Sequence, residues 1–225
     1  MDLDALLAEL AAWAEEREPG FETVAYGEDP DQVVDVRRGG DRSAILVHGG
    51  FWRPAFTRSN TRALAVDLTL RGWTTWNVEY RRTGLENTLA DTAAALDVTG
   101  SGVAIGHSAG GHLVLWAAGT GKVEKAVALA GVTDLARAAR EGIGANAAVE
   151  FAGPEPPAHA DPMRRLPVTV PVLLAHGTED DRVPFDYSRA FAQAADVELL
   201  ELPGAGHFEL IDPRTPEWAS VVDRL

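Results

Sequence analysis

The chain contains no cysteine among its 225 residues. This absence excludes disulfide bonds, thiolate metal sites and a cysteine nucleophile, and it is compatible with a reducing compartment. Positive charge is also scarce, because 20 lysine and arginine residues stand against 34 aspartate and glutamate residues, a formal net charge of −14. Nucleic acids and anionic membrane surfaces are bound through basic patches, so we expect neither as a partner.

Long apolar runs are missing as well. No run approaches the roughly 20 residues that a membrane-spanning helix requires. The first ten residues carry acids within their apolar run and follow no basic segment, which is unlike a secretory signal peptide. We therefore expect a soluble, cytoplasmic protein. The length and the lack of repeats or linkers predict a single domain over residues 1–225.

Strand-like apolar runs alternate with helix-like segments along the chain. The strands are predicted at 22–26, 33–36, 44–47, 73–78, 102–105, 125–130, 172–175 and 197–202, and helices at 2–17, 58–71, 89–98, 112–118, 185–195 and 216–225. This alternation predicts a mostly parallel sheet that helices cover on both faces. Residues 1–20 form an N-terminal helix in this interpretation, and 133–168 form a short insertion that resembles a cap.

The segment Gly106-His-Ser-Ala-Gly110 joins a predicted strand to a predicted helix. In the G-x-S-x-G pattern, such a turn holds the serine in a strained conformation that exposes its hydroxyl group. Five residues with three fixed positions also match by chance in a chain with 22 glycines. The placement between a strand and a helix favours Ser108 as a nucleophile.

A serine hydroxyl needs a base to take its proton, and the base needs an acid to orient it. His207 follows the last predicted strand in a glycine-rich loop, and we predict that it is the base. The alternative is a loop histidine that caps the last helix. His107 is expected to point away from the site, whereas His48 and His176 are expected to bond the backbone of their His-Gly turns.

The acid is ambiguous from the residues alone. Glu179, Asp180 and Asp181 are consecutive, and alternate side chains of an extended loop point to opposite sides. Asp134 is an outside candidate that is more typical of a helix N-cap.

Acyl transfer also requires N–H groups that face the developing oxyanion. The N–H of Ala109 follows the nucleophile, and Gly50 and Phe51 follow the strand at 44–47, where the second donor is expected. An ordinary glycine turn is the alternative at His48-Gly-Gly-Phe51.

From about residue 30 onward the chain resembles the α/β-hydrolase superfamily. The segment from His176 to Pro184 matches the motif His-Gly-x-x-Asp-x-x-Val-Pro, and this resemblance places the acid at Asp180. His48-Gly-Gly-Phe-Trp52, the serine motif and Glu79-Tyr-Arg81 resemble the branch of hormone-sensitive-lipase-like esterases and kynurenine formamidases. The resemblance implies an α/β-hydrolase fold with about eight strands and a minimal cap. It also implies roles for Ser108, Asp180 and His207 as a catalytic triad and for Gly50, Phe51 and Ala109 as oxyanion donors.

The leading hypothesis is hydrolysis of small carboxylic esters through an acyl-serine intermediate, without a metal ion or cofactor. An arylformamidase or another amidase is the alternative, since His-Gly-Gly-Phe-Trp is close to a formamidase motif. A non-catalytic binding protein on the same fold is the rival from another class, although such proteins usually lose the serine or the histidine. We expect Trp52 and Tyr80 to contribute to the substrate pocket. The expected partner is a small ester or amide, and the protein is expected to be a monomer or a homodimer.

Overall fold

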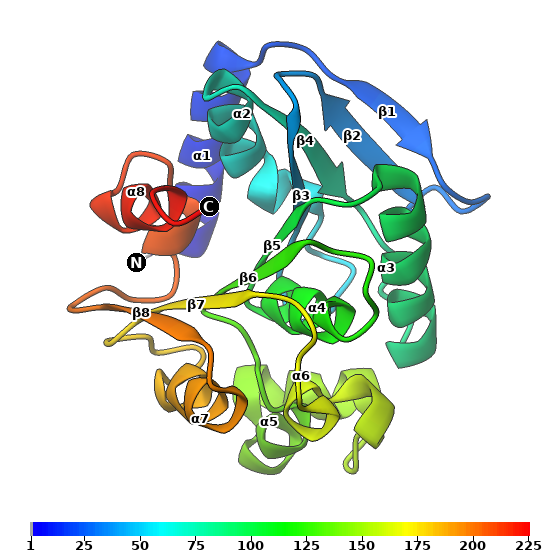
Figure 1. Cartoon of the computed structure of the whole chain (residues 1–225), viewed down its shortest axis with the longest axis vertical. Helices are drawn as coiled ribbons and strands as arrows, with labels where there is room; N and C mark the ends of the chain where they lie inside the picture. The colour runs from blue at the N-terminus through cyan, green and yellow to red at the C-terminus, as the bar shows by residue number, and fades with distance from the viewer. Residues whose placement is uncertain (1) are drawn as a thin grey trace.

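The computed structural model describes residues 2–225 and contains a sheet of eight strands in the order β1-β2-β4-β3-β5-β6-β7-β8 (Figure 1). The strands are β1 (Glu22–Ala25), β2 (Val33–Arg37), β3 (Arg42–Val47), β4 (Trp73–Val78), β5 (Val103–His107), β6 (Lys125–Leu129), β7 (Val172–Gly177) and β8 (Glu198–Leu202). From β4 to β8 in this order the neighbours are parallel, whereas β2 is antiparallel to both β1 and β4. The mostly parallel sheet predicted from the sequence is confirmed.

Helices cover both faces of the sheet. One face carries α1 (Leu3–Arg17), α2 (Arg62–Leu70) and α8 (Pro216–Val222), and the other carries α3 (Leu85–Thr99), α4 (Ala109–Ala118) and α7 (Asp186–Ala195) (Figure 1). Two further helices, α5 (Leu135–Glu141) and α6 (Ile143–Ala152), follow β6, and short 3-10 turns lie at Arg58–Thr61, Ala158–Ala160, Pro162–Arg165 and Glu209–Ile211. Two apolar cores therefore form, one on each side of the sheet.

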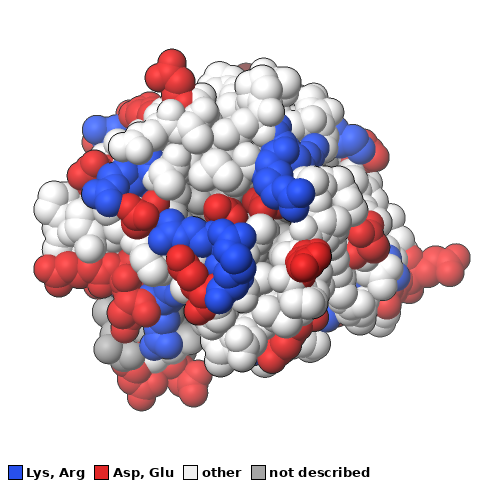
Figure 2. All heavy atoms as spheres, turned by 90° about the horizontal axis from the view of Figure 1, so that it is seen from below, with Lys and Arg blue, Asp and Glu red and all other residues white. Residues whose placement is uncertain are grey.

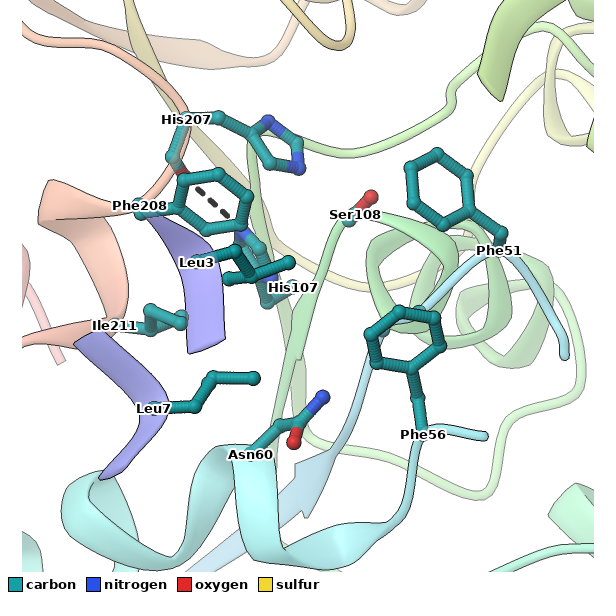
Figure 3. Close-up of a pocket in the computed structure, with 12 residues that line it drawn as sticks. Leu3, Leu7, Phe51, Phe56, Asn60, His107, Ser108, His207, Phe208 and Ile211 are labelled. Carbon is teal, nitrogen blue, oxygen red and sulfur yellow. Dashed lines mark hydrogen bonds between the residues drawn. The ribbon is translucent and has the colours of Figure 1, made fainter. Parts of the chain in front are cut away.

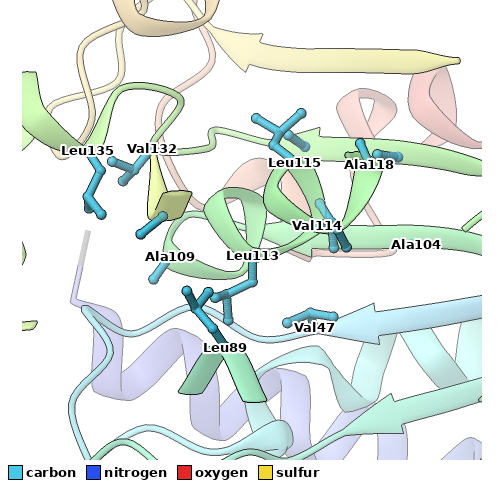
Figure 4. Close-up of a cluster of buried hydrophobic side chains, with 14 of the residues drawn as sticks. Val47, Leu89, Ala104, Ala109, Leu113, Val114, Leu115, Ala118, Val132 and Leu135 are labelled. Carbon is cyan, nitrogen blue, oxygen red and sulfur yellow. The ribbon is translucent and has the colours of Figure 1, made fainter. Parts of the chain in front are cut away.

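The central strands read as continuous apolar runs because both of their faces are buried. All six residues of β7 are buried, whereas three of the four residues of β1 at the sheet edge are exposed. Figure 4 shows the core between the sheet and α4, in which Leu113 and Val114 of the helix lie near Val47 of β3 and Leu89 of α3. This packing holds α4, and with it the turn that precedes the helix, firmly against the sheet.

Helix α1 begins at Asp2, whose carboxylate accepts hydrogen bonds from the N–H groups of Asp4 and Ala5. Its buried residues are Leu6, Leu10 and Ala14, a helical spacing that packs the helix against α2. Leu3 and Leu7 form a second apolar stripe on the same helix. That second stripe faces the carboxyl ends of the strands (Figure 3).

Two aspartates stabilise the insertion 133–168 from within. Asp134 is the N-cap of α5 and accepts a hydrogen bond of 2.7 Å from the N–H of Arg137. The fully buried Asp161 accepts hydrogen bonds of 3.1 Å from the N–H groups of Leu135 and Ala136. Asp134 thus adopts the capping role that the sequence favoured for it.

Opposite charges are mixed on the face seen from below in Figure 1, where α5, α6 and α7 lie (Figure 2). Arg137 of α5, for example, forms ion pairs with Glu141 and with Asp186 of α7. The acidic excess of the chain is therefore interrupted by local pairs on this face. No helix within residues 2–225 is both long and apolar enough to span a membrane.

Candidate active site

Ser108 lies on the sharp turn between β5 and α4. Its backbone has φ 55° and ψ −115°, a left-handed conformation that costs roughly 1–3 kcal/mol in a non-glycine residue. The turn requires glycine at two positions, since a Cβ on Gly106 would lie 2.1 Å from the carbonyl oxygen of Gly110, and a Cβ on Gly110 would lie 2.1 Å from that of Val47. This geometry directs the Ser108 side chain into an open pocket (Figure 3).

His207 and Asp180 meet above this turn. Nδ1 of His207 donates a hydrogen bond of 2.6 Å to Oδ2 of Asp180. The other carboxylate oxygen of Asp180 accepts bonds of 2.8 Å from the N–H groups of Arg182 and Val183. Because Nδ1 carries the proton, Nε2 of His207 remains an acceptor, and the ring extends toward Ser108 (Figure 3).

The ambiguity among the three consecutive acids is resolved by burial. The Asp180 side chain is fully buried, whereas that of Asp181 is 79% exposed. Burial opposes the charge of Asp180, but hydrogen bonds from His176 and His207 outweigh it and hold the pKa of this carboxyl well below its usual range. Asp180 is therefore the ionised partner of His207. Glu179 and Asp181 line a separate polar hollow beside His207.

The orientation of His107 differs from the one expected from the sequence. Its ring does not point away from the site; it lines the pocket and lies beside the ring of His207, with 4.6 Å between the centroids. Nε2 of His107 donates a hydrogen bond of 2.9 Å to the carbonyl oxygen of His207. Burial lowers the pKa of His107 to about 3, so the ring is neutral and braces the loop that carries His207.

His48 and His176 are buried and each bonds a backbone carbonyl, which for His48 lies in its own His-Gly turn, as predicted, but for His176 lies outside its turn. Nδ1 of His48 lies 2.8 Å from the oxygen of Gly49, and Nε2 of His176 lies 2.9 Å from that of Val183. Each ring also bonds a carboxylate, which the sequence did not indicate: His48 contacts Glu79 and His176 contacts Asp180.

The loop after β3 passes directly beside the nucleophile. A Cβ on Gly49 would lie 3.0 Å from the Cβ of Ser108. Gly50, Phe51 and Trp52 follow with φ values of 111°, 58° and 53°, three left-handed residues in succession. Within residues 2–225, the backbone N–H groups of Gly50, Phe51 and Ala109 have no hydrogen-bond acceptor. Unpaired donors on both sides of Ser108 are the arrangement that an oxyanion requires.

The pocket at Ser108 is a small cavity of about 30 Å³. Its walls are mainly apolar and come from distant parts of the chain: Leu3, Leu7, Phe51, Phe56, Asn60, Phe208 and Ile211, around Gly49, Gly50, His107, Ser108 and His207. None of these residues belongs to the insertion 133–168. The N-terminal helix, for which no part in the site was predicted, forms one wall of the pocket through Leu3 and Leu7 (Figure 3). The one sequence signal for this role was its second apolar stripe.

Two predicted pocket residues lie elsewhere. The Trp52 ring stacks on Phe151 with 4.6 Å between the centroids and lines a separate hollow beyond Phe51. Tyr80 is fully buried, its ring stacks on His48, and its hydroxyl donates to the carbonyl oxygen of His48. Trp52 and Tyr80, which were predicted to contribute to the substrate pocket, do not line the cavity at Ser108. The left-handed turn at Trp52 directs its ring into the core, and Tyr80 supports the glycine loop from behind.

Comparisons with solved structures give the same architecture. A candidate thioesterase from Silicibacter sp. TM1040 is 21% identical, with 98% of this chain and 94% of that chain covered and a TM-score of 0.75. Esterase 2 of Thermogutta terrifontis, solved after phosphonylation by sarin, is 20% identical, with 92% of each chain covered and a TM-score of 0.72. The same enzyme has been solved with butyrate and with propionate bound. A truncated carbohydrate esterase from gut microbiota is 17% identical, covers 93% of this chain and 96% of its own, and has a TM-score of 0.73.

At these identities the comparisons establish the fold, and they confirm the resemblance to the α/β-hydrolases. A sequence comparison with curated proteins found no significant match. The model of the prolyl oligopeptidase family matches residues 88–216. That range is more than half of the chain and includes Ser108, Asp180 and His207. The chain therefore belongs to the prolyl oligopeptidase family.

Proposed function

We propose that this protein is a serine hydrolase that cleaves small carboxylic esters through an acyl-serine intermediate. The observation that carries the proposal is the hydrogen bond of 2.6 Å between Asp180 and His207, directly above the turn of Ser108. The carboxylate fixes the tautomer of the imidazole and stabilises the cation that forms when the ring takes a proton. Nε2 of His207 is thereby the base for the hydroxyl of Ser108.

The reaction follows from this arrangement in two stages. Oγ of Ser108 attacks the ester carbonyl carbon while Nε2 of His207 takes the hydroxyl proton. The tetrahedral intermediate collapses, the alcohol leaves with that proton, and an acyl-serine remains. A water molecule then attacks the acyl carbon with His207 again as base, and the carboxylic acid is released as Ser108 regains its proton.

The negative oxygen of each tetrahedral intermediate needs hydrogen-bond donors. The N–H groups of Ala109, Gly50 and Phe51 flank Ser108 and have no acceptor among the described residues 2–225. Loss of one such donor typically reduces kcat by about 100- to 1,000-fold. We therefore assign these three N–H groups to the oxyanion hole.

The size and lining of the pocket support a small, apolar acyl or alcohol group. A cavity of about 30 Å³, bounded by Phe51, Phe56, Phe208 and the leucines of α1, leaves little space for a long chain. The binding of butyrate and propionate by the Thermogutta esterase is in keeping with this size. Its phosphonylation by sarin is the behaviour expected of an activated serine in this fold.

Membership of the prolyl oligopeptidase family favours a second candidate, the cleavage of small amides or peptides. The same triad serves both chemistries, since an amide differs in its poorer leaving group, which His207 must protonate. The formamidase alternative rested on His48-Gly-Gly-Phe-Trp52. Because Trp52 lies outside the pocket, the structure adds no support for it.

The decisive experiment compares p-nitrophenyl esters from acetate to decanoate with N-formylkynurenine and an alanine p-nitroanilide, using Ser108→Ala as control. We expect maximal kcat/KM at the short esters and none in the variant. Faster turnover of the anilide or of N-formylkynurenine would replace the ester assignment by the corresponding amide assignment. A folded wild-type protein that fails to react with a fluorophosphonate would contradict serine catalysis altogether.

A further inference from the structure

The side chain of His48 lies behind the glycine loop and is fully buried. Nδ1 is 2.8 Å from the carbonyl oxygen of Gly49, and Nε2 is 2.8 Å from Oε1 of Glu79. The ring stacks on Tyr80, with 4.4 Å between the centroids and 11° between the planes. The ring is therefore held on its face and at both nitrogens, although it does not touch the pocket.

Both partners of this ring are acceptors. A carbonyl oxygen can only accept, and the carboxylate of Glu79 already accepts from the N–H groups of Tyr80 and Arg58 and from the guanidinium of Arg82. Burial opposes the charge of Glu79, but the hydrogen bond from His48 and the neighbouring charges outweigh it and lower the pKa of the carboxyl. The ring of His48 thus lies between two acceptors, one at each of its nitrogens.

Two arginines hold Glu79 in place. Arg82 pairs with Glu79 and with Asp31, and Arg58 pairs with Asp35 and lies 3.7 Å from Glu79. The side chain of Glu79 is only 2% exposed, so these contacts fix its carboxylate against the ring of His48.

The contact at Gly49 has a direct consequence for the site. The carbonyl of Gly49 and the N–H of Gly50 belong to one trans peptide group and point in opposite directions. Because His48 holds the carbonyl toward the buried side, the N–H of Gly50 must face away from His48. On that other side lies Ser108, against which Gly49 packs.

We propose that the buried pair of His48 and Glu79 orients the Gly49–Gly50 peptide and so aims the Gly50 N–H at the oxyanion. This inference rests on the proposed function, because it assigns a task to residues behind the proposed oxyanion hole. His48 and Glu79 are positioning residues: neither touches the substrate. They act on the reaction only by orienting the peptide group between Gly49 and Gly50.

A pair of substitutions separates the two contacts of His48. The amide nitrogen of asparagine takes the place of Nδ1, so His48→Asn retains a donor for Gly49. The amide nitrogen of glutamine takes the place of Nε2, so His48→Gln retains a donor for Glu79 and loses the one for Gly49. With p-nitrophenyl acetate we expect kcat to fall about 100-fold in His48→Gln and less than about tenfold in His48→Asn, with KM within about twofold in both.

The exposed His159 supplies the matched control, since His159→Gln should leave kcat and KM unchanged while circular dichroism verifies that all variants are folded. Equal losses of kcat in the two His48 variants, or a change confined to KM, would overturn the positioning role.

The contact at Gly49 is tested separately, by NMR of the wild-type protein with isotope-labelled histidine. A proton on Nδ1 of His48, hydrogen-bonded to the carbonyl of Gly49, is expected, and a ring without a proton on Nδ1 would overturn the proposal. This measurement needs no turnover and no His48 variant that folds. It therefore tests the pair even if the wild-type protein hydrolyses no ester, an outcome that would contradict the proposed function alone.

Discussion

Oδ2 of Asp180 accepts hydrogen bonds from two histidines, at 2.6 Å from Nδ1 of His207 and at 3.1 Å from Nε2 of His176. His176 is held in turn by the hydroxyl of Ser188, 2.7 Å from its Nδ1. His176, which belongs to β7, thus fixes the Asp180 carboxylate on one side, and His207 contacts the same oxygen from its own loop. The sheet therefore determines, through Asp180, how the ring of His207 is oriented.

Replacement of Ser108 tests the nucleophile. We expect Ser108→Ala to lower kcat on p-nitrophenyl acetate by about 10,000-fold or more and to abolish labelling by a fluorophosphonate, because no other hydroxyl occupies the turn. The thermal midpoint of unfolding should change little, since the Ser108 hydroxyl bonds no other group within residues 2–225. Residual labelling in the folded variant would show that another residue reacts.

The neighbouring acids provide a matched pair of variants. Asp180→Asn should reduce kcat by about 10,000-fold, because an amide no longer stabilises the imidazolium or fixes its tautomer. Asp181→Asn should change kcat by less than about twofold, because that side chain is 79% exposed and contacts Arg182 only. Steady-state kinetics of the two variants decide the assignment. Equal losses would mean that the acid is not Asp180.

Stability in acid should reflect the buried histidines. Burial lowers the pKa of His107 to about 3 and that of His112 to about 4, from an ordinary value of 6.5. At pH values between these lowered pKa values and 6.5, the unfolded chain binds more protons than the folded protein. The free energy of unfolding should therefore fall as the pH is lowered below 6.5.

Urea unfolding at a series of pH values measures this effect, with His107→Gln as the test variant. Glutamine retains an N–H donor for the carbonyl of His207 but does not titrate, so the loss of stability in acid should be shallower. A variant with the same pH dependence as the wild type would show that His107 does not contribute.

The wall formed by α1 predicts how chain-length preference can be changed. Leu7→Ala removes three carbons from the pocket lining, so longer acyl groups should gain relative to acetate, by roughly tenfold for one or two added methylenes. The ratio of kcat/KM for p-nitrophenyl hexanoate and acetate measures the change. Leu70→Ala, at a side chain that is 57% exposed, is the control. An unaltered ratio in Leu7→Ala would mean that the acyl chain does not reach α1.

The local features of this protein were predictable from the sequence by itself. The alternation of apolar runs determined the eight strands and the helices, and the glycines around Ser108 determined the strained turn after β5. These features depend on residues close together in the chain, where the periodicity and the steric limits of the backbone decide the outcome. Asp180 was identified only with the help of a family motif. Which of the three consecutive acids contacts His207 depended on the tertiary structure, because only the fold shows which of them is buried against His176 and His207.

Tertiary structure alone decided what surrounds the nucleophile. Leu3, Phe56 and Ile211 meet at one pocket although about 200 residues separate the first from the last, and no local pattern encodes such a meeting. The rings of Trp52 and Tyr80 were expected in that pocket, but the backbone conformation at Trp52 and the stacking of Tyr80 on His48 turned them into the core. The hydrogen bond between His48 and Glu79 likewise required β3 and β4 to lie side by side, because only their pairing brings the Glu79 carboxylate within 2.8 Å of the His48 ring.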